Sequence, residues 1–223
     1  MMGSLRIMVA DDHEVVRRGL RALLEAQPGW TVCAESSNGR DVLQKAAELR
    51  PDVIVLDIAM PNLNGLETTR QLLKTDPRTK ILILTLHDSE QVIREVLAAG
   101  ARGFLLKSDA ARDLVAAVDA LRQGKTYFTS RVAAMVLDGF LKGGPGVEMS
   151  ACTNPLTPRE REIVQLLAEG KSTKEVASVL GLSVKTAETH RSNIMRKLDI
   201  HSVSDLVLYA VRNNIIHVTP MAV

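Results

Sequence analysis

Over residues 5–123, short apolar runs alternate with helix-length stretches that carry apolar residues on one side only. Five such pairs occur in this region, and the alternation is typical of a parallel β-sheet covered by α-helices. Because the runs at 53–56 and 81–84 are apolar at every position, we expect them to be central strands and the others to lie closer to an edge. The expected strands are residues 6–10, 31–35, 53–56, 81–84 and 102–106, and the expected helices are residues 14–26, 40–49, 66–74, 89–99 and 110–123.

The C-terminal part of the chain follows a different pattern. Four short helices are expected at residues 158–168, 173–180, 184–198 and 203–213, since each follows a Thr or Ser that can cap its first turn. Before them lie an amphipathic stretch at 130–141 and a Gly/Pro-rich run at 143–146. We therefore predict an α/β domain with a five-stranded doubly wound parallel sheet at 1–125, a linker at 126–154 that starts helical and ends flexible, and a small all-α four-helix domain at 155–223.

Charge and composition exclude several classes of protein. The longest apolar run has six residues, far short of the ~20 that a membrane-spanning helix needs. Two cysteines, Cys33 and Cys152, are too few for a disulfide scaffold, so we expect a cytoplasmic protein. Residues 1–125 carry 17 basic and 17 acidic side chains, whereas residues 185–197 carry four basic side chains against one acid. That local excess of positive charge could meet phosphates or could belong to a solvated helix face.

Polar side chains follow four of the five expected strands. Asp11 and Asp12 follow the first strand, Asp57 the third, Thr85 the fourth and Lys107 the fifth. Because ligands of open parallel sheets bind at the carboxyl ends of the strands, we expect these side chains to converge on one rim. Three carboxylates so close together favour a divalent cation such as Mg²⁺, and Asp57 becomes a candidate nucleophile that forms an aspartyl phosphate.

The same segments resemble the receiver domains of two-component response regulators. The resemblance covers essentially residues 5–123 and is carried by Asp11-Asp12-His13, Val53–Asp57 with Met60-Pro61 and Gly65, Ile81–Thr85, and Gly100–Lys107. It implies that Asp57 accepts a phosphoryl group from a sensor histidine kinase and that Thr85 and Lys107 contact that group. It also implies that Asp11, Asp12 and Asp57 bind Mg²⁺ with the carbonyl of Ala59, and that Phe104 changes rotamer on activation.

Two positions near the expected rim depart from common receiver patterns, and a third distinguishes the rim from that of phosphatases. Leu86 stands where many receivers have a small residue, and Ser108 stands where many have Pro. Ala59 replaces the second Asp that phosphatases use to hydrolyse their aspartyl phosphate, so the phosphorylated state should persist. We hypothesise that Ala59 and His87 set the rate of its hydrolysis.

The expected helix 184–198 has two distinct faces. At ~100° per residue, Lys185, Glu188, Thr189, Ser192 and Arg196 fall on one side, opposite the apolar residues Ala187, Ile194 and Leu198. A short turn through Gly181 joins it to the preceding helix, as in helix-turn-helix proteins. From this geometry alone, a generic three-helix packing module remains an alternative.

The residues of this region resemble LuxR-type helix-turn-helix domains over about residues 155–217. The segments concerned are Leu156–Ile163, Ala168–Ser172, Lys174–Ala177, Leu182–Thr186 and His190–Leu198. Together with the receiver, the chain looks like the NarL/FixJ subfamily of response regulators. The resemblance implies base contacts by Lys185, Glu188, Thr189 and Ser192, and phosphate contacts by Thr186, Arg191, Asn193 and Lys197.

Two further expectations concern DNA. Glu188 stands where many relatives have a basic residue, and because a carboxylate can accept a hydrogen bond from cytosine, we expect it to read a G·C pair. His190 is expected on the packed side of the helix. In relatives the last helix forms a dimer on DNA, which implies two half-sites on a promoter.

The sequence therefore predicts a transcriptional regulator that is not an enzyme: phosphorylation of Asp57 promotes homodimerisation and promoter binding, with no membrane association. Two alternatives stay open. One is a DNA-binding protein whose receiver is regulated by protein contacts alone, and the other is a Mg²⁺-dependent phosphohydrolase, which Ala59 disfavours.

Overall fold

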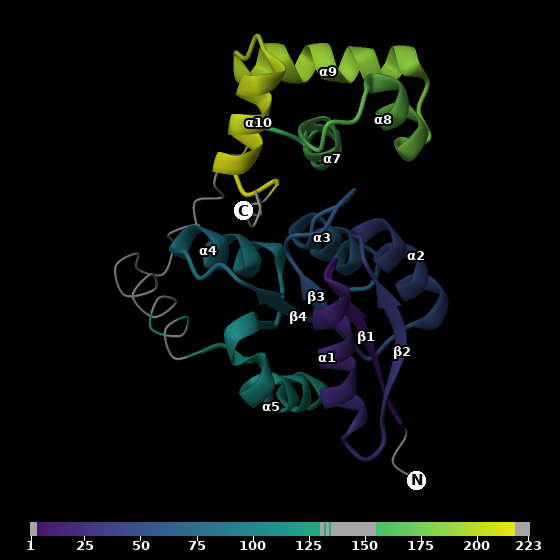
Figure 1. Cartoon of the computed structure of the whole chain (residues 1–223), viewed down its shortest axis with the longest axis vertical. Helices are drawn as coiled ribbons and strands as arrows, with labels where there is room; N and C mark the ends of the chain where they lie inside the picture. Colours follow the sequence, from purple (N-terminus) through teal and green to yellow (C-terminus); the bar gives the residue numbers. More distant parts are fainter. Residues whose placement is uncertain (1–3, 130–131, 133, 135–154, 217–223) are drawn as a thin grey trace. The chain divides into compact units, whose positions relative to one another are not determined.

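The computed structural model describes residues 4–129, 132, 134 and 155–216. The chain divides into two compact units, of which the first holds most of residues 1–151 and the second holds residues 152–223. Figure 1 shows that the first unit is a sheet covered by helices and that the second is a group of helices. The helix expected at 130–141 and the Gly/Pro-rich run fall almost wholly outside the described residues.

The first unit contains a five-stranded parallel sheet with the strand order β2-β1-β3-β4-β5. The fold class predicted for this unit is confirmed. The prediction that the first strand lies closer to an edge than the fourth is wrong, because β1 and β4 each lie one place in from an edge and pair with a strand on both sides. Arg6 is exposed in a strand that is otherwise buried, and this single charge gave β1 the appearance of an edge strand. The strands are β1 (Leu5–Ala10), β2 (Trp30–Ser36), β3 (Val53–Asp57), β4 (Lys80–Thr85) and β5 (Gly103–Leu106).

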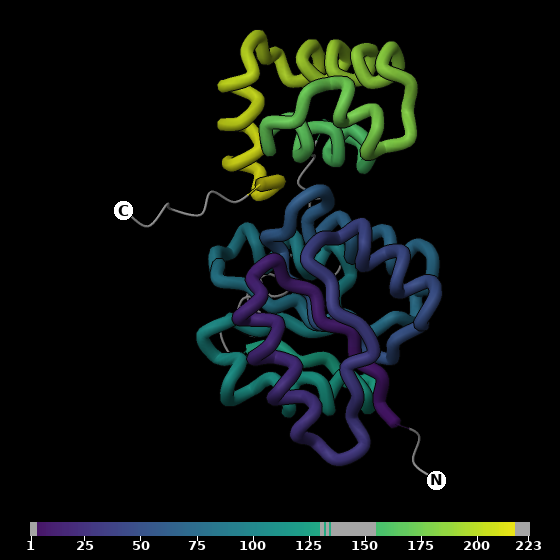
Figure 2. The backbone as a smooth tube through the Cα atoms, turned by 45° about the vertical axis from the view of Figure 1, so that its right-hand side comes forward, coloured from purple at the N-terminus to yellow at the C-terminus, as the bar shows by residue number. Residues whose placement is uncertain are grey.

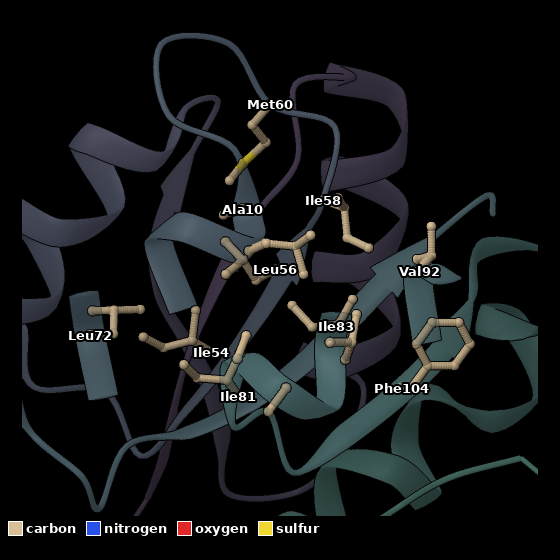
Figure 3. Close-up of a cluster of buried hydrophobic side chains, with 14 of the residues drawn as sticks. Ala10, Ile54, Leu56, Ile58, Met60, Leu72, Ile81, Ile83, Val92 and Phe104 are labelled. Atoms are coloured by element: carbon tan, nitrogen blue, oxygen red, sulfur yellow. The ribbon is translucent and has the colours of Figure 1, made fainter. Parts of the chain in front are cut away.

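Helices cover both faces of this sheet. One apolar cluster joins α2, α3 and α4 to one face, and a second joins α1 and α5 to the other. Figure 3 shows the first cluster, in which Phe104 of β5 lies beside Val92 of α4 and near Ile83 of β4. The helices are α1 (Glu14–Glu25), α2 (Gly39–Leu49), α3 (Gly65–Thr75), α4 (Glu90–Ala99) and α5 (Ala110–Arg122), with a 3₁₀ turn at Lys107–Asp109.

The second unit is a set of short helices around its own apolar core, and Figure 2 traces their backbone. Thr157 and Ser172 both make complete capping boxes, and Ser183 and Ser202 cap the helices that follow them. The predicted helix starts are thereby confirmed, and only the end of the last helix differs, by one residue. The helices are α7 (Pro158–Ala168), α8 (Thr173–Leu180), α9 (Val184–Leu198) and α10 (Val203–Arg212).

None of the described helices combines the length and the apolar character that a membrane crossing requires.

Candidate functional site

The carboxyl ends of β1, β3 and β5 bring together the side chains that we call the acidic rim: Asp11, Asp12, Asp57 and Lys107. The Nζ atom of Lys107 lies 2.7 Å from Oδ2 of Asp11 and 2.8 Å from Oδ2 of Asp57. One carboxylate oxygen from each of the three Asp residues lies within 4.8 Å of the other two. The structure thus gathers four of the five side chains that the sequence placed at this edge, although they are far apart in the chain.

Burial raises the free-energy cost of charge in the acidic rim. The side chains of Asp57 and Lys107 are only 2% and 9% exposed. Burial raises the pKa of Asp57 from its ordinary 3.8 to about 6, although the charge of Lys107 lowers it. Burial lowers the pKa of Lys107, but attraction by Asp57 and hydrogen bonds to Asp11 and Asp57 outweigh this and raise it above its ordinary value. Lys107 therefore stays protonated, whereas ionising Asp57 costs more free energy than ionising an exposed aspartate.

The donor set of the acidic rim fits a hard divalent cation. Three carboxylates face a single ammonium, so negative charge is in excess when all three are ionised. Carboxylate oxygens are the ligands that Mg²⁺ prefers in proteins, and a cation among them would relieve the repulsion. Ala59, whose carbonyl the sequence added to this set, lies two residues beyond Asp57 and is partly exposed.

His13 belongs to this neighbourhood, although the sequence gave it no role. Its Nδ1 atom lies 2.6 Å from Oδ1 of Asp12, and its backbone N–H donates to Oδ1 of Asp11 at 2.9 Å. His13 directly follows the Asp pair and is the N-cap residue of α1. Its place just beyond the end of a strand is the signal that could have identified it.

Thr85 and Phe104 lie beside the acidic rim at two different depths. Thr85 is the last residue of β4 and is buried, and its Oγ1 accepts a hydrogen bond from the backbone N–H of His87 at 3.1 Å. Phe104 is paired with Ile83 in the sheet and is buried in the apolar cluster shown in Figure 3. The structure places Thr85 at the same sheet edge as Asp57 and places Phe104 in the packed layer behind that edge.

The loop after Asp57 folds back over the backbone of that residue. The N–H of Gly65 donates to the carbonyl of Ile58 at 2.9 Å, and a Cβ added to Gly65 would clash with the carbonyl oxygen of Asp57. Glycine is required there because of this close approach. Gly65 thereby holds the loop that contains Ala59 against the end of β3.

The second candidate surface is the polar side of α9. Ala187 and Ile194 are buried, whereas the residues expected to face DNA are exposed or, for Arg191, half-buried. We call these eight residues the α9 face: Lys185, Thr186, Glu188, Thr189, Arg191, Ser192, Asn193 and Lys197.

Two side chains of the α9 face, Arg191 and Lys197, contact other helices of the second unit. Arg191 donates to Oγ1 of Thr173 on α8 at 3.3 Å, and Nζ of Lys197 lies 2.9 Å from Oε2 of Glu160 on α7. His190 is half-buried and lines a hollow of ≈ 370 Å³ together with residues of the α9 face. The prediction that His190 lies on the packed side of the helix is therefore only partly correct.

Comparisons with known proteins agree on both units. Residues 7–119 match the family described as response regulator receiver domain, and residues 154–210 match the bacterial regulatory proteins of the luxR family. The chain is 38% identical over 216 residues to the oxygen regulatory protein NreC of Staphylococcus epidermidis, covering 95% of this chain and 99% of NreC. It is 38% identical over 213 residues to the transcriptional regulatory protein LiaR of Bacillus subtilis, covering 96% and 100% of the two chains.

Solved structures of two response regulators are similar to this chain over nearly its whole length. RcsB of Salmonella typhimurium has a TM-score of 0.61 and 26% identity, over 95% of this chain and 99% of RcsB. The response regulator ChrA of a heme-sensing two-component system has a TM-score of 0.51 and 34% identity, over 96% and 100% of the two chains. These relatives are described as regulators, and none of the four is described as an enzyme.

Proposed function

The chain belongs to the two-component response regulators of the NarL/FixJ subfamily, and we propose that Asp57 is the phosphoryl acceptor that controls its binding to promoter DNA. The observation that carries this proposal is the position of Lys107, whose ammonium lies 2.8 Å from Asp57 and 2.7 Å from Asp11. An ammonium held between two buried carboxylates is close enough to donate to the oxygens of a phosphoryl group formed on one of them.

The acceptor chemistry follows from the same side chains. An oxygen of the Asp57 carboxylate forms a bond to phosphorus while the bond from phosphorus to the imidazole nitrogen of a sensor kinase breaks, and the imidazole leaves with the electron pair. Asp11, Asp12 and Asp57, with the carbonyl of Ala59, are the groups that would hold Mg²⁺. When bound, that ion supplies positive charge that neutralises the phosphoryl oxygens.

Thr85 and Phe104 can turn this chemistry into a change of shape. The hydroxyl of Thr85 accepts from His87 and can also donate its proton to a phosphoryl oxygen on Asp57. A shift of Thr85 toward the phosphoryl group changes the packing beside β4, and Phe104 on the neighbouring strand can move into the space that is vacated. The surface next to α4 and β5 is then altered.

The second unit is the part of the chain that binds DNA in this proposal. The α9 face presents Lys185, Glu188, Thr189 and Ser192 for base contacts, and Thr186, Arg191, Asn193 and Lys197 for phosphates. Structures of RcsB include dimers on DNA and a promoter complex with a phosphomimetic. These support a homodimer of this chain on two promoter half-sites, which implies a cytoplasmic place of action. We assign the receiver to 1–125, the linker to 126–154 and the DNA-binding domain to 155–223.

Phosphoryl labelling tests this proposal. The full chain is incubated with Mg²⁺ and a small acyl phosphate, and intact mass and promoter affinity are measured. We expect one added phosphoryl group, tighter promoter binding, and loss of both effects in Asp57→Asn. The exposed Asp76, replaced by Asn, is the matched control and should label normally.

Three results would contradict the proposal. Equal labelling of Asp57→Asn would place the phosphoryl group elsewhere, and promoter binding that ignores labelling would favour control of the receiver by protein contacts alone. Continuous release of phosphate from an added monoester would instead favour the phosphohydrolase alternative.

A further inference from the structure

One cation of the α9 face is neutralised from outside α9. Oε2 of Glu160, in the first turn of α7, lies 2.9 Å from Nζ of Lys197 in the last turn of α9. Across the described residues 155–216, Lys185, Arg191 and Arg196 have no carboxylate within ion-pair distance. Lys197 therefore differs from the other basic side chains of the helix before any DNA is present.

The carboxylate that holds Lys197 is fixed by the start of α7. Oε2 of Glu160 also accepts a hydrogen bond from the backbone N–H of Thr157 at 2.7 Å, while the N–H of Glu160 donates to Oγ1 of Thr157 at 3.3 Å. The Glu160 side chain takes part in this capping box and is only 13% exposed. Because the carboxylate is already ordered, only Lys197 loses side-chain entropy when the pair forms, so the pair should be stronger than an ordinary surface pair.

Glu160 also keeps its charge under ordinary conditions. Burial raises its pKa, but hydrogen bonds from Thr157 and Lys197 outweigh burial and lower it below its ordinary value of 4.5. A DNA phosphate that approaches Lys197 must therefore compete with an ionised carboxylate for the same ammonium and is also repelled by that carboxylate.

This competition acts wherever Lys197 meets a DNA phosphate. Nonspecific binding depends almost entirely on phosphate contacts, so losing one cation weakens it directly. Base contacts add affinity on specific sites but do not replace the phosphate contact that is lost. A masked phosphate-binding lysine therefore lowers the affinity that this chain has for any DNA.

We propose that Glu160 limits the phosphate-contact affinity of the α9 face: by neutralising Lys197, it lowers the affinity for nonspecific DNA. The proposal rests on the proposed approach of the α9 face to DNA phosphates. It assigns to α7, a helix outside the helix-turn-helix pair, a direct influence on DNA affinity.

The test compares Glu160→Gln, Lys197→Gln and the double variant in the full chain, with a random-sequence duplex titrated at several salt concentrations. Gln also completes a capping box, so Glu160→Gln should keep the start of α7 intact. We expect Glu160→Gln to raise nonspecific affinity several-fold and to steepen the salt slope by up to ~0.9, the value of one added phosphate contact. In the Lys197→Gln background the same change should have little effect.

Glu175→Gln is the matched control. Glu175 occupies the same capping-box position on α8, bonded to Ser172, and no ion pair joins it to a cation of α9 among the described residues. Its effect should be unchanged in the Lys197→Gln background. Equal effects of Glu160→Gln with and without Lys197 would overturn the inference while leaving DNA binding itself intact. Absence of any DNA binding by the unaltered chain would instead overturn the proposed function, and the inference with it.

Discussion

The acidic rim and the α9 face use ionised side chains in opposite surroundings. In the rim, Asp57 and Lys107 are almost fully buried and neutralise one another within a few ångströms. On α9, Lys185 and its neighbours extend into solvent above the buried Ala187 and Ile194. Because the rim is buried, its energy depends strongly on the charge of each single group. Solvent and salt screen the charges of the α9 face. The comparison predicts that the rim responds to pH and that the α9 face responds to salt.

The largest expected effect tests the buried side of α9. Ile194 is fully buried in the core of the second unit, so Ile194→Ala should cost about 2 to 5 kcal/mol of unfolding free energy. Ser192→Ala, on the exposed side of the same helix, should change it by less than about 0.5 kcal/mol. Hydrogen exchange of peptides from 184–198 measures both. Similar losses in the two variants would refute the division of α9 into a packed side and a free side.

A smaller effect, of opposite sign, is expected at the acidic rim. The pKa of Asp57 is about 6 in the folded chain and 3.8 ordinarily, so the protonated form is favoured by folding. The stability from Asp57 is fully present below about pH 4 and is lost as the pH rises through about 6. In EDTA at pH 7, Asp57→Asn should therefore stabilise the first unit by about 2 to 3 kcal/mol.

This gain should vanish below pH 4, where both chains carry a neutral side chain at position 57. Trp30, the single tryptophan of the chain, lies in β2 of the first unit and reports its unfolding by fluorescence. A stabilisation that does not vary with pH would point to better packing of the introduced amide side chain and away from a charge effect.

The smallest effect on stability is expected at the centre of the α9 face. Glu188 is exposed, so Glu188→Lys should change the unfolding free energy by less than about 0.5 kcal/mol. It should raise nonspecific DNA affinity and steepen its salt dependence, because it removes a carboxylate that repels phosphates and adds an ammonium. A binding selection should also show a changed base preference, and an unchanged preference would argue against direct readout by Glu188.

The sequence predicts much of the acidic rim and of the α9 face, because strand alternation and helical periodicity determine where the residues concerned lie. Parallel strands deliver their carboxyl ends to one edge, so Asp11, Asp57 and Lys107 could be grouped from the chain alone. Helical periodicity likewise predicted that Ile194 is buried.

What the sequence could not predict depends on contacts between distant segments or on a single misleading residue. The pair between Glu160 and Lys197 requires the packing of α7 against α9, which no local pattern specifies. The clash that makes Gly65 necessary exists only once its loop has returned to Asp57. The interior place of β1 was hidden by one exposed arginine at its start.

The order of the strands also bears on synthesis by the ribosome. β1 is made first but lies between β2 and β3, so its second neighbour appears only after residue 57 has emerged. Lys107, the counter-charge of the acidic rim, is made fifty residues later still. Until Lys107 is made, closing that end of the sheet would bring three aspartates together without their ammonium, so like-charge repulsion opposes early closure. The last strand, β5, and the lysine that completes the site are therefore synthesised together, late in translation of the first unit.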